Sequence, residues 1–233
     1  MSTIDPQATM AELVLECPAL TSLLERLDLD FCCNGSATLA AACAERDLDV
    51  ETLVRVLEAE ARSAPRAPQH VFDCRSASTA ELCDHILSAH HEPLRAELPR
   101  LADTLATVVR VHGGDDPRLL TLARTFDDLA GELLAHFDRE EQQLFPAGAA
   151  LESGAGSVDE QSLLDELEDD HADVGEALRT LRDLGDGYRV EAARCGTHRA
   201  LLEGLAALER DLHLHIHEEN NVLFPRIRSR LAA

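Results

Sequence analysis

The chain has 233 residues, of which 45% are hydrophobic and 3% are aromatic, and it contains no tryptophan. Its 44 acidic and 21 basic residues give a formal net charge of −23 at pH 7, which repels nucleic acid and anionic membrane surfaces. Because alanine, leucine, glutamate and arginine dominate and strand-forming residues are scarce, the composition predicts an all-α protein with neither a nucleic-acid nor a membrane partner.

The N-terminus carries Asp5 and Glu12 where a secretory signal needs positive charge and an apolar core. No apolar run approaches the roughly 20 residues of a membrane span, so we expect a cytoplasmic protein. The seven cysteines form an odd count spread through the chain, which argues against a disulfide framework. They include no Cys-x-x-Cys pair, which argues against a zinc ribbon or a thioredoxin-type site. Four of them are interpreted as small buried apolar side chains: Cys17, Cys43, Cys83 and Cys195.

Residues 1–62 are expected to form a small helical domain. Thr9 and Glu12 have the spacing of a capping box, and Pro18 suits a first helical turn. Residues 28–35, Asp-Leu-Asp-Phe-Cys-Cys-Asn-Gly, then interrupt the helical pattern with turn residues.

That turn contains the adjacent Cys32 and Cys33, which are less easily both buried than isolated cysteines. Helices are expected again over residues 36–46 and 49–62. Residues 63–78 contain two prolines and no hydrophobic period, so they are interpreted as a linker.

Residues 79–233 are expected to form a second domain of four long helices. Pro93 and Pro99 fall inside the first helix, where each removes an amide donor and is expected to bend it. The expected boundaries follow from capping and stop signals: Ser78 to Gly113-Gly114, Asp116-Pro117 to about Pro146, Ser157 to Gly185, and much of residues 190–230.

A repeated motif lies in the second and fourth of these helices. His136 and Glu140 are followed by Leu-Phe-Pro, and so are His215 and Glu219. Residues four apart lie on one face of a helix, so each copy directs an imidazole and a carboxylate to the same point. A single pair of this kind is usually a surface ion pair, but the duplication favours metal ligation.

A lone histidine precedes each copy at a matched distance. His91 lies 45 residues before His136, and His171 lies 44 residues before His215. Two such helical pairs close into a four-helix bundle whose core receives side chains from all four helices. Four imidazoles and two carboxylates are therefore expected to meet there.

The helical register separates these residues from their neighbours. Glu218 aligns with Arg139, whereas Glu219 aligns with Glu140. The other candidates are expected to point away from the bundle core, to be solvated or outer-sphere, or to lie too far along the helix: His85, His90, His112, Glu141, His213 and His217.

Six donors are too few for two separate octahedral sites, yet they suffice for two ions that share bridging carboxylates. Imidazole and carboxylate together suit iron or manganese better than zinc in a bridged site. Ferritin-type bundles use Glu-x-x-His with lone glutamates, whereas here the lone residues are histidines, as in the hemerythrin-like arrangement.

The two His-x-x-x-Glu segments together with Asp30-Phe-Cys-Cys-Asn-Gly35 resemble the repair-of-iron-centres (RIC) family, the ScdA/YtfE-like di-iron proteins. The resemblance implies a hemerythrin-like four-helix bundle preceded by a small helical domain, and a cytoplasmic homodimer that repairs iron-sulfur clusters damaged by oxidative or nitrosative stress. It implies that two iron ions, bridged by carboxylates and an oxo or hydroxo group, are held by six residues: His91, His136, Glu140, His171, His215 and Glu219.

The resemblance also matches Cys32 and Cys33 to the family's cysteine pair, with a possible part in iron or redox transfer. The expected partners are damaged iron-sulfur proteins or a scaffold, and nitric oxide or oxygen as small ligands. Two alternatives stay open, namely a nitric oxide or peroxide reductase, and an oxygen or nitric oxide carrier or sensor. The Cys-Cys domain favours repair, because a gas carrier needs only the bundle.

Overall fold

The computed structural model describes residues 4–63, 72–152 and 160–232, except the side chains of residues 152 and 160. Within these ranges the regular elements are helices, and the one β interaction is a bridge between Thr9 and Thr38. The all-α prediction is therefore confirmed. The chain divides into two compact units, Met1–Ser78 with His213–Arg226, and Thr79–Leu212 with Ile227–Ala233.

The N-terminal helices are short, and the first of them begins at a clear capping signal. Thr9 caps α1 (Met10–Glu16), where its hydroxyl accepts the Glu12 amide at 3.2 Å and the Glu12 carboxylate accepts the Thr9 amide at 2.8 Å. The predicted capping box is therefore confirmed. The elements that follow are η1 (Pro18–Leu20), α2 (Thr21–Arg26), α3 (Leu39–Glu45) and α4 (Val50–Ser63). The prediction of a helix from residue 36 was wrong at its start, because Thr38 is the N-cap of α3.

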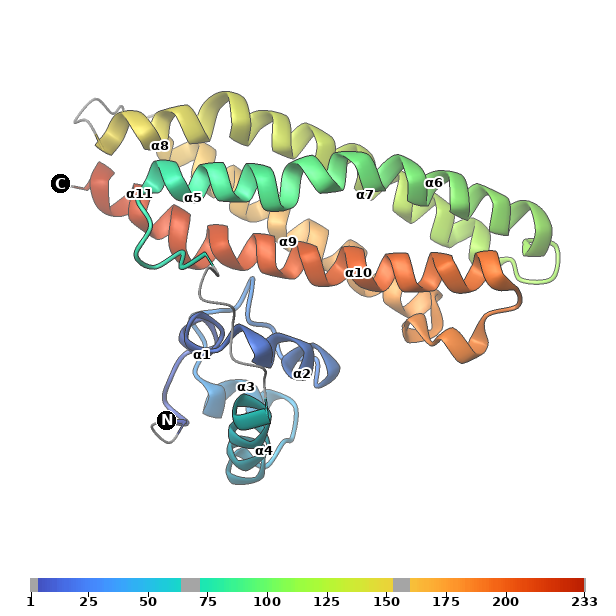
Figure 1. Ribbon diagram of the computed structural model, residues 1–233, viewed down its shortest axis with the longest axis horizontal. Coiled ribbons are helices and arrows are strands. Elements are labelled where there is room, and N and C mark those ends of the chain that lie inside the picture. The colour runs from blue at the N-terminus through green and yellow to red at the C-terminus, as the bar shows by residue number, and fades with distance from the viewer. Residues whose placement is uncertain (1–3, 64–71, 153–159, 233) are drawn as a thin grey trace. The chain divides into compact units, whose positions relative to one another are not determined.

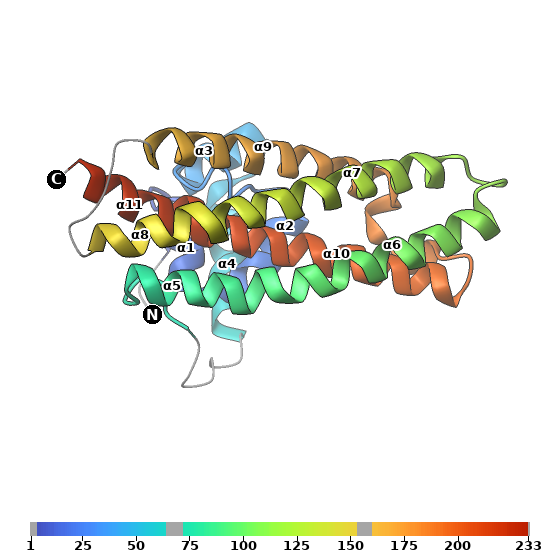
Figure 2. The ribbon, with the colours of Figure 1, turned by 90° about the horizontal axis from the view of Figure 1, so that it is seen from above.

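Four long helical segments follow, and Figures 1 and 2 show them side by side along a common direction. Helix α7 packs against α6 and α9. Gly204 of α10 faces Leu101 of α6 so closely that a Cβ at residue 204 would lie 2.5 Å from the leucine Cδ2. The segments are α5–η2–α6 (Thr79–Ile86, Leu87–His91, Glu92–His112), α7–η3–α8 (Arg118–Arg139, Glu140–Leu144, Phe145–Glu152), α9 (Glu160–Leu184) and α10–η6–α11 (Gly196–Glu218, Glu219–Leu223, Phe224–Leu231).

Several predicted boundaries needed correction. The second segment begins at Arg118, one residue later than predicted, and continues past Pro146 to Glu152. The fourth fills much of residues 190–230, as predicted, and begins at Gly196 after the separate 3-10 turn of Val190–Ala192. The third ends at Leu184, as Gly185 predicted, whereas its expected start at Ser157 lies outside the described residues.

Three π-helical turns explain how the helices pass through three of their prolines, whereas Pro99 lies inside α6 without such a turn. The turns η2, η3 and η6 each end two residues before a proline: Pro93, Pro146 and Pro225. At each turn the amide that follows bonds five residues back, as the Phe145 amide does to the Glu140 carbonyl. A proline lacks an amide donor and its ring clashes with the preceding turn of an α-helix, so the wider π turn accommodates it.

Among the described residues, no helix combines the length and apolar character needed to cross a bilayer.

Candidate metal centre

The six predicted ligands all lie in the interior of the protein. Two of the π turns begin at a ligand, Glu140 in η3 and Glu219 in η6, and a third ends at His91. The remaining histidines lie on α7, α9 and α10. Each of the six is at most 2% exposed: His91, His136, Glu140, His171, His215 and Glu219.

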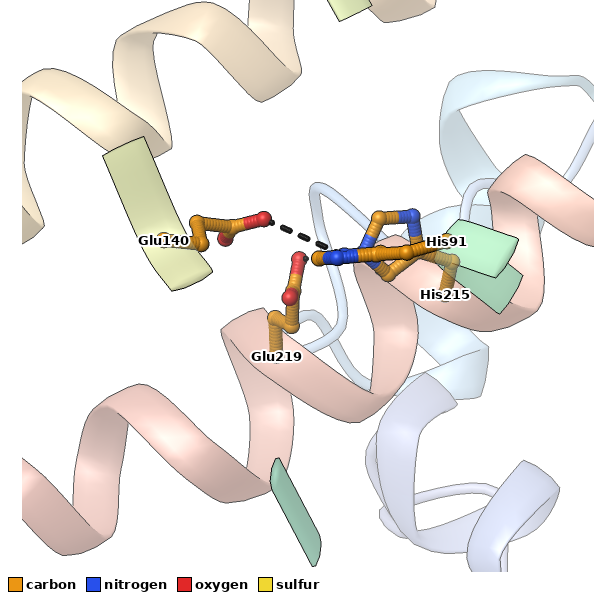
Figure 3. A group of neighbouring side chains, drawn as sticks. All are labelled: His91, Glu140, His215 and Glu219. Atoms are coloured by element: carbon orange, nitrogen blue, oxygen red, sulfur yellow. Dashed lines mark ion pairs between the residues drawn. The ribbon is translucent and has the colours of Figure 1, made fainter. Parts of the chain in front are cut away.

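These residues form two groups that share both carboxylates. In each group the ligand-type atoms lie within 4.8 Å of one another, and Glu140 and Glu219 belong to both. The first group adds His91 and His215, and the second adds His136 and His171. Figure 3 shows the side chains of the first group pointing toward one another. This is the pattern that two ions with shared carboxylates require.

Glu140 directs one oxygen toward each of two imidazoles. Its Oε2 lies 3.4 Å from His91 Nε2, and its Oε1 lies 3.3 Å from His136 Nε2. Glu219 Oε2 lies 3.0 Å from His215 Nε2. Both carboxylates are fully buried, and burying two negative charges is costly unless cations or hydrogen bonds compensate them.

Outer carboxylates set the orientation of two histidines. His91 Nδ1 lies 3.0 Å from Glu141 Oε1, and His136 Nδ1 lies 2.9 Å from Asp170 Oδ2. With Nδ1 donating to a carboxylate, a neutral imidazole presents the lone pair of Nε2. The Nε2 lone pair of His136 then faces the Glu140 carboxylate, and a cation between these acceptors would remove their repulsion. The donor set therefore fits a metal.

Arginines hold the outer carboxylates in place. Arg139 forms an ion pair with Asp170, and Arg95 donates to Glu141 at 3.1 Å. The hydrogen bond from His136, and then the nearby positive charge of Arg139, lower the pKa of Asp170. Asp170 therefore keeps the negative charge that orients His136. It was not identified from the sequence, although it directly precedes His171.

Aromatic packing fixes the ring of His91. The ring stacks on Phe137 with centroids 4.3 Å apart and on Phe145 with centroids 5.6 Å apart. Phe145 is the phenylalanine of the first Leu-Phe-Pro segment. Phe145 therefore holds the ring of the predicted ligand His91, in addition to standing directly before Pro146.

The residues set aside by register lie outside both ligand groups. His85, His90 and Glu218 form a separate group of ligand-type atoms within 4.8 Å of one another, and His90 Nδ1 also lies 3.1 Å from Asp211 Oδ1. His112 Nε2 lies 3.3 Å from Cys195 Sγ. Glu141 is the outer partner of His91, which is one of the two roles expected for it.

The cysteine pair has one buried and one exposed member. Cys32 is 6% exposed and Cys33 is exposed, with their sulfur atoms 3.8 Å apart. Asp30 Oδ1 accepts the amides of Cys32 at 3.1 Å and Cys33 at 2.9 Å. The hydrogen bond with Cys33, followed by burial and the charges of Cys33 and Asp30, raises the pKa of the Cys32 thiol.

The remaining cysteines are all free thiols. Cys43 and Cys83 are buried as predicted, and Cys17 is partly buried. The prediction for Cys195 was wrong, because this residue is exposed just before α10, where its sulfur accepts the His198 amide at 3.4 Å.

Two parts of the chain match known protein families. Residues 84–227 match the hemerythrin HHE cation binding domain, and residues 6–61 match ScdA_N, described as a domain of unknown function, DUF542. Proteins described as iron-sulfur cluster repair protein YtfE are similar over 93% of the chain. Those of Citrobacter koseri and Escherichia coli are 36% identical over 94% of their own length, and that of Edwardsiella ictaluri is 36% identical over 95%.

The chain belongs to the ScdA/YtfE-like family. The sequence resemblance and the predicted hemerythrin-like bundle are therefore confirmed. In this family member, the cation-binding match contains all six buried histidines and glutamates, and the N-terminal match contains the cysteine pair. The buried groups are accordingly those of a cation-binding domain.

Proposed function

We propose that this protein repairs damaged iron-sulfur clusters by supplying iron from the paired histidine–glutamate groups. The observation that carries the proposal is that Glu140 and Glu219 belong to both groups, while each group has its own two imidazoles. The relatives named as iron-sulfur cluster repair proteins support the same function.

The donor set supports two iron ions as the metals. Each group offers two imidazole nitrogens and oxygens of two shared carboxylates, a mixture that suits iron and leaves positions for an oxo or hydroxo bridge or a small ligand. When bound, iron would supply the material for repair, and its reduction by an external electron donor would weaken its bonds to the hard oxygen donors Glu140 and Glu219. Since no carboxylate belongs to one ion alone, the site is suited to release as well as to storage.

The cysteine pair is proposed as the first acceptor of released iron. Within the pair, the exposed Cys33 can meet iron or a partner first, because Cys32 is buried and its raised pKa keeps that thiol protonated. We propose the matching division of labour, with residues 1–62 handling iron or electrons, 63–78 as linker and 79–233 storing iron. The proposed setting is a cytoplasmic homodimer under oxidative or nitrosative stress that serves damaged iron-sulfur proteins or a scaffold.

Iron transfer to a defined acceptor tests the function. Protein loaded with ferrous iron is mixed anaerobically with an apo-ferredoxin, inorganic sulfide and a thiol reductant, and both iron loss and cluster absorbance are followed. We expect iron to leave as a cluster forms, and Cys33→Ser to slow the transfer at unchanged iron content. Cys195→Ser is the matched control, because it removes another exposed thiol.

Two results would overturn the proposal in favour of the alternatives. Catalytic consumption of nitric oxide or peroxide with both irons retained would identify a reductase. Reversible binding of oxygen or nitric oxide without iron transfer would identify a carrier or sensor.

A separate result bears on the cysteine pair alone. Iron transfer at the wild-type rate by Cys32→Ser and Cys33→Ser would remove the pair from the mechanism.

A further inference from the structure

The cysteine turn is held by the chain segment that carries Glu219. Both belong to the compact unit formed by Met1–Ser78 and His213–Arg226. Asn221 Nδ2 donates to the carbonyl of Cys32 at 3.0 Å and to that of Phe31 at 3.3 Å.

His217 also contacts the carbonyl of Phe31. Its Nδ1 lies 3.2 Å from the Phe31 oxygen, and its ring meets the edge of the Phe31 ring with centroids 5.8 Å apart. Phe31 is 2% exposed, and so is His217. The backbone on the N-terminal side of Cys32 is therefore fixed by buried contacts.

Gly35 permits this close approach. A Cβ placed there would lie 2.1 Å from Asn221 Oδ1 and 2.8 Å from Nδ2. Any larger residue must therefore displace the asparagine amide from the two carbonyls. The glycine in the Cys-Cys-Asn-Gly turn thus has a packing reason of its own.

The asparagine and the proposed iron ligand share one π-helical turn. Glu219 begins η6 and Asn221 is its third residue, and the Phe224 amide bonds to the Glu219 carbonyl five residues back. Such turns are rare and occur mostly as single bulges at functional sites. When a bulge moves along a helix, each side chain it passes turns by about 100° around the axis. The orientation of Asn221 therefore depends on where the bulge is held.

We infer that Asn221 is a positioning residue that couples iron binding at Glu219 to the burial of Cys32. This inference rests on the proposed iron centre. Iron on Glu219 holds the π turn in place, so Asn221 stays on the two carbonyls and Cys32 stays buried. When iron leaves, the turn is released and the amide separates from the carbonyls. Both thiols of the pair are then accessible at the moment when iron has been given up.

Alkylation of the two thiols tests this coupling directly. Iron-loaded and metal-free protein are treated with N-ethylmaleimide, and mass spectrometry counts one or two adducts on the peptide that contains Cys32 and Cys33. In the wild type we expect the second adduct to form about ten-fold faster without iron, since two hydrogen bonds to the turn are lost. The rate at Cys195, an exposed thiol of the other unit, serves as the internal reference.

Two variants and one control separate coupling from general loosening. Asn221→Ala and Gly35→Ala should each give the fast second adduct with or without iron, at unchanged iron content. Gly114→Ala is the control, because a Cβ there meets nothing within 4 Å, and it should respond to iron as the wild type does.

The outcomes distinguish this inference from the repair function. Equal rates of second-adduct formation in loaded and metal-free wild type would overturn the coupling, as would a normal iron response in Asn221→Ala. If the coupling is observed but no iron reaches an apo-ferredoxin, the inference stands and the repair function fails. If iron is transferred while Cys32 does not respond, the repair function stands and the inference fails.

Discussion

Replacing Asp170 by asparagine should weaken metal binding in one group of the centre. The carboxylate lies 2.9 Å from His136 Nδ1, and their hydrogen bond is the main cause of the lowered pKa of Asp170. Asparagine preserves the size of the side chain but removes the charge. The orientation and basicity of His136 then lose their support.

The size of the effect follows from the position of Asp170. Loss of an outer-sphere partner costs about 10- to 100-fold in metal affinity. Asp170 is 32% exposed, so solvent screens part of its charge and the lower limit applies. We expect a loss of about ten-fold, or about 1.4 kcal/mol. Only the group with His136 and His171 contains the affected imidazole, so one of two ions should be weakened.

Competition with a chromophoric chelator measures this loss. Wild-type protein should release its ferrous iron with two similar affinities, whereas Asp170→Asn should show one weakened step. Asp169→Asn is the matched control, because it removes an exposed carboxylate next in sequence. Arg139→Gln removes the ion pair and leaves the His136–Asp170 bond, so it should stay near the wild type. Equal affinities in Asp170→Asn and Asp169→Asn would refute the reasoning.

Three further predictions concern stability, and urea unfolding of the metal-free protein measures each. Gly204→Ala should lower the free energy of unfolding by about 1–3 kcal/mol, because the new Cβ would meet Leu101. Gly131→Ala is the control: its Cβ meets nothing within 4 Å, so it should raise the free energy of unfolding by about 0.5–1 kcal/mol, and equal effects of the two variants would contradict the contact between α6 and α10. Arg182→Gln should lower the free energy of unfolding by about 2 kcal/mol, because Glu209 is only 3% exposed and loses the positive charge paired with it. The loss is limited because the Arg182 side chain is 37% exposed, and a loss near zero would show that other groups stabilise the Glu209 carboxylate. Arg118 lowers the pKa of Asp116, so Asp116→Asn should lose about 1 kcal/mol at pH 7. This difference should begin to shrink below about pH 4, where the unfolded carboxylate protonates, and should vanish as the pH falls through the lowered pKa of the folded carboxylate; a difference that persists at low pH would exclude the charge as its source.

The grouping of the six candidate ligands could be predicted because helical periodicity and duplication place them. Residues four apart share a helix face, so the sequence alone grouped each His with its Glu, and the structure brings all six residues together. The third helix could be tied to the centre only by the matched distance between His171 and His215. The His171 side chain does belong to one of the two groups, and its Nε2 lies 3.0 Å from His136 Nε2.

The π turns could not be predicted from the same periodicity. A pattern of 3.6 residues describes an α-helix, and a single inserted residue leaves too short a signature to detect. The helical pattern therefore predicts an end of the second helix near Pro146, although η3 lets the helix continue to Glu152. Asp170 was missed for another reason: a carboxylate that supports a ligand on a different helix depends on tertiary packing, which local spacing does not contain.

The measurement that tests the central claim most directly is the Mössbauer spectrum and iron content of protein reconstituted with ferrous iron and then oxidised. Because Glu140 and Glu219 belong to both groups, we predict two irons per chain that are magnetically coupled, and loss of this coupling in Glu219→Gln. One iron per chain, or two irons without coupling, would contradict a centre with shared carboxylates.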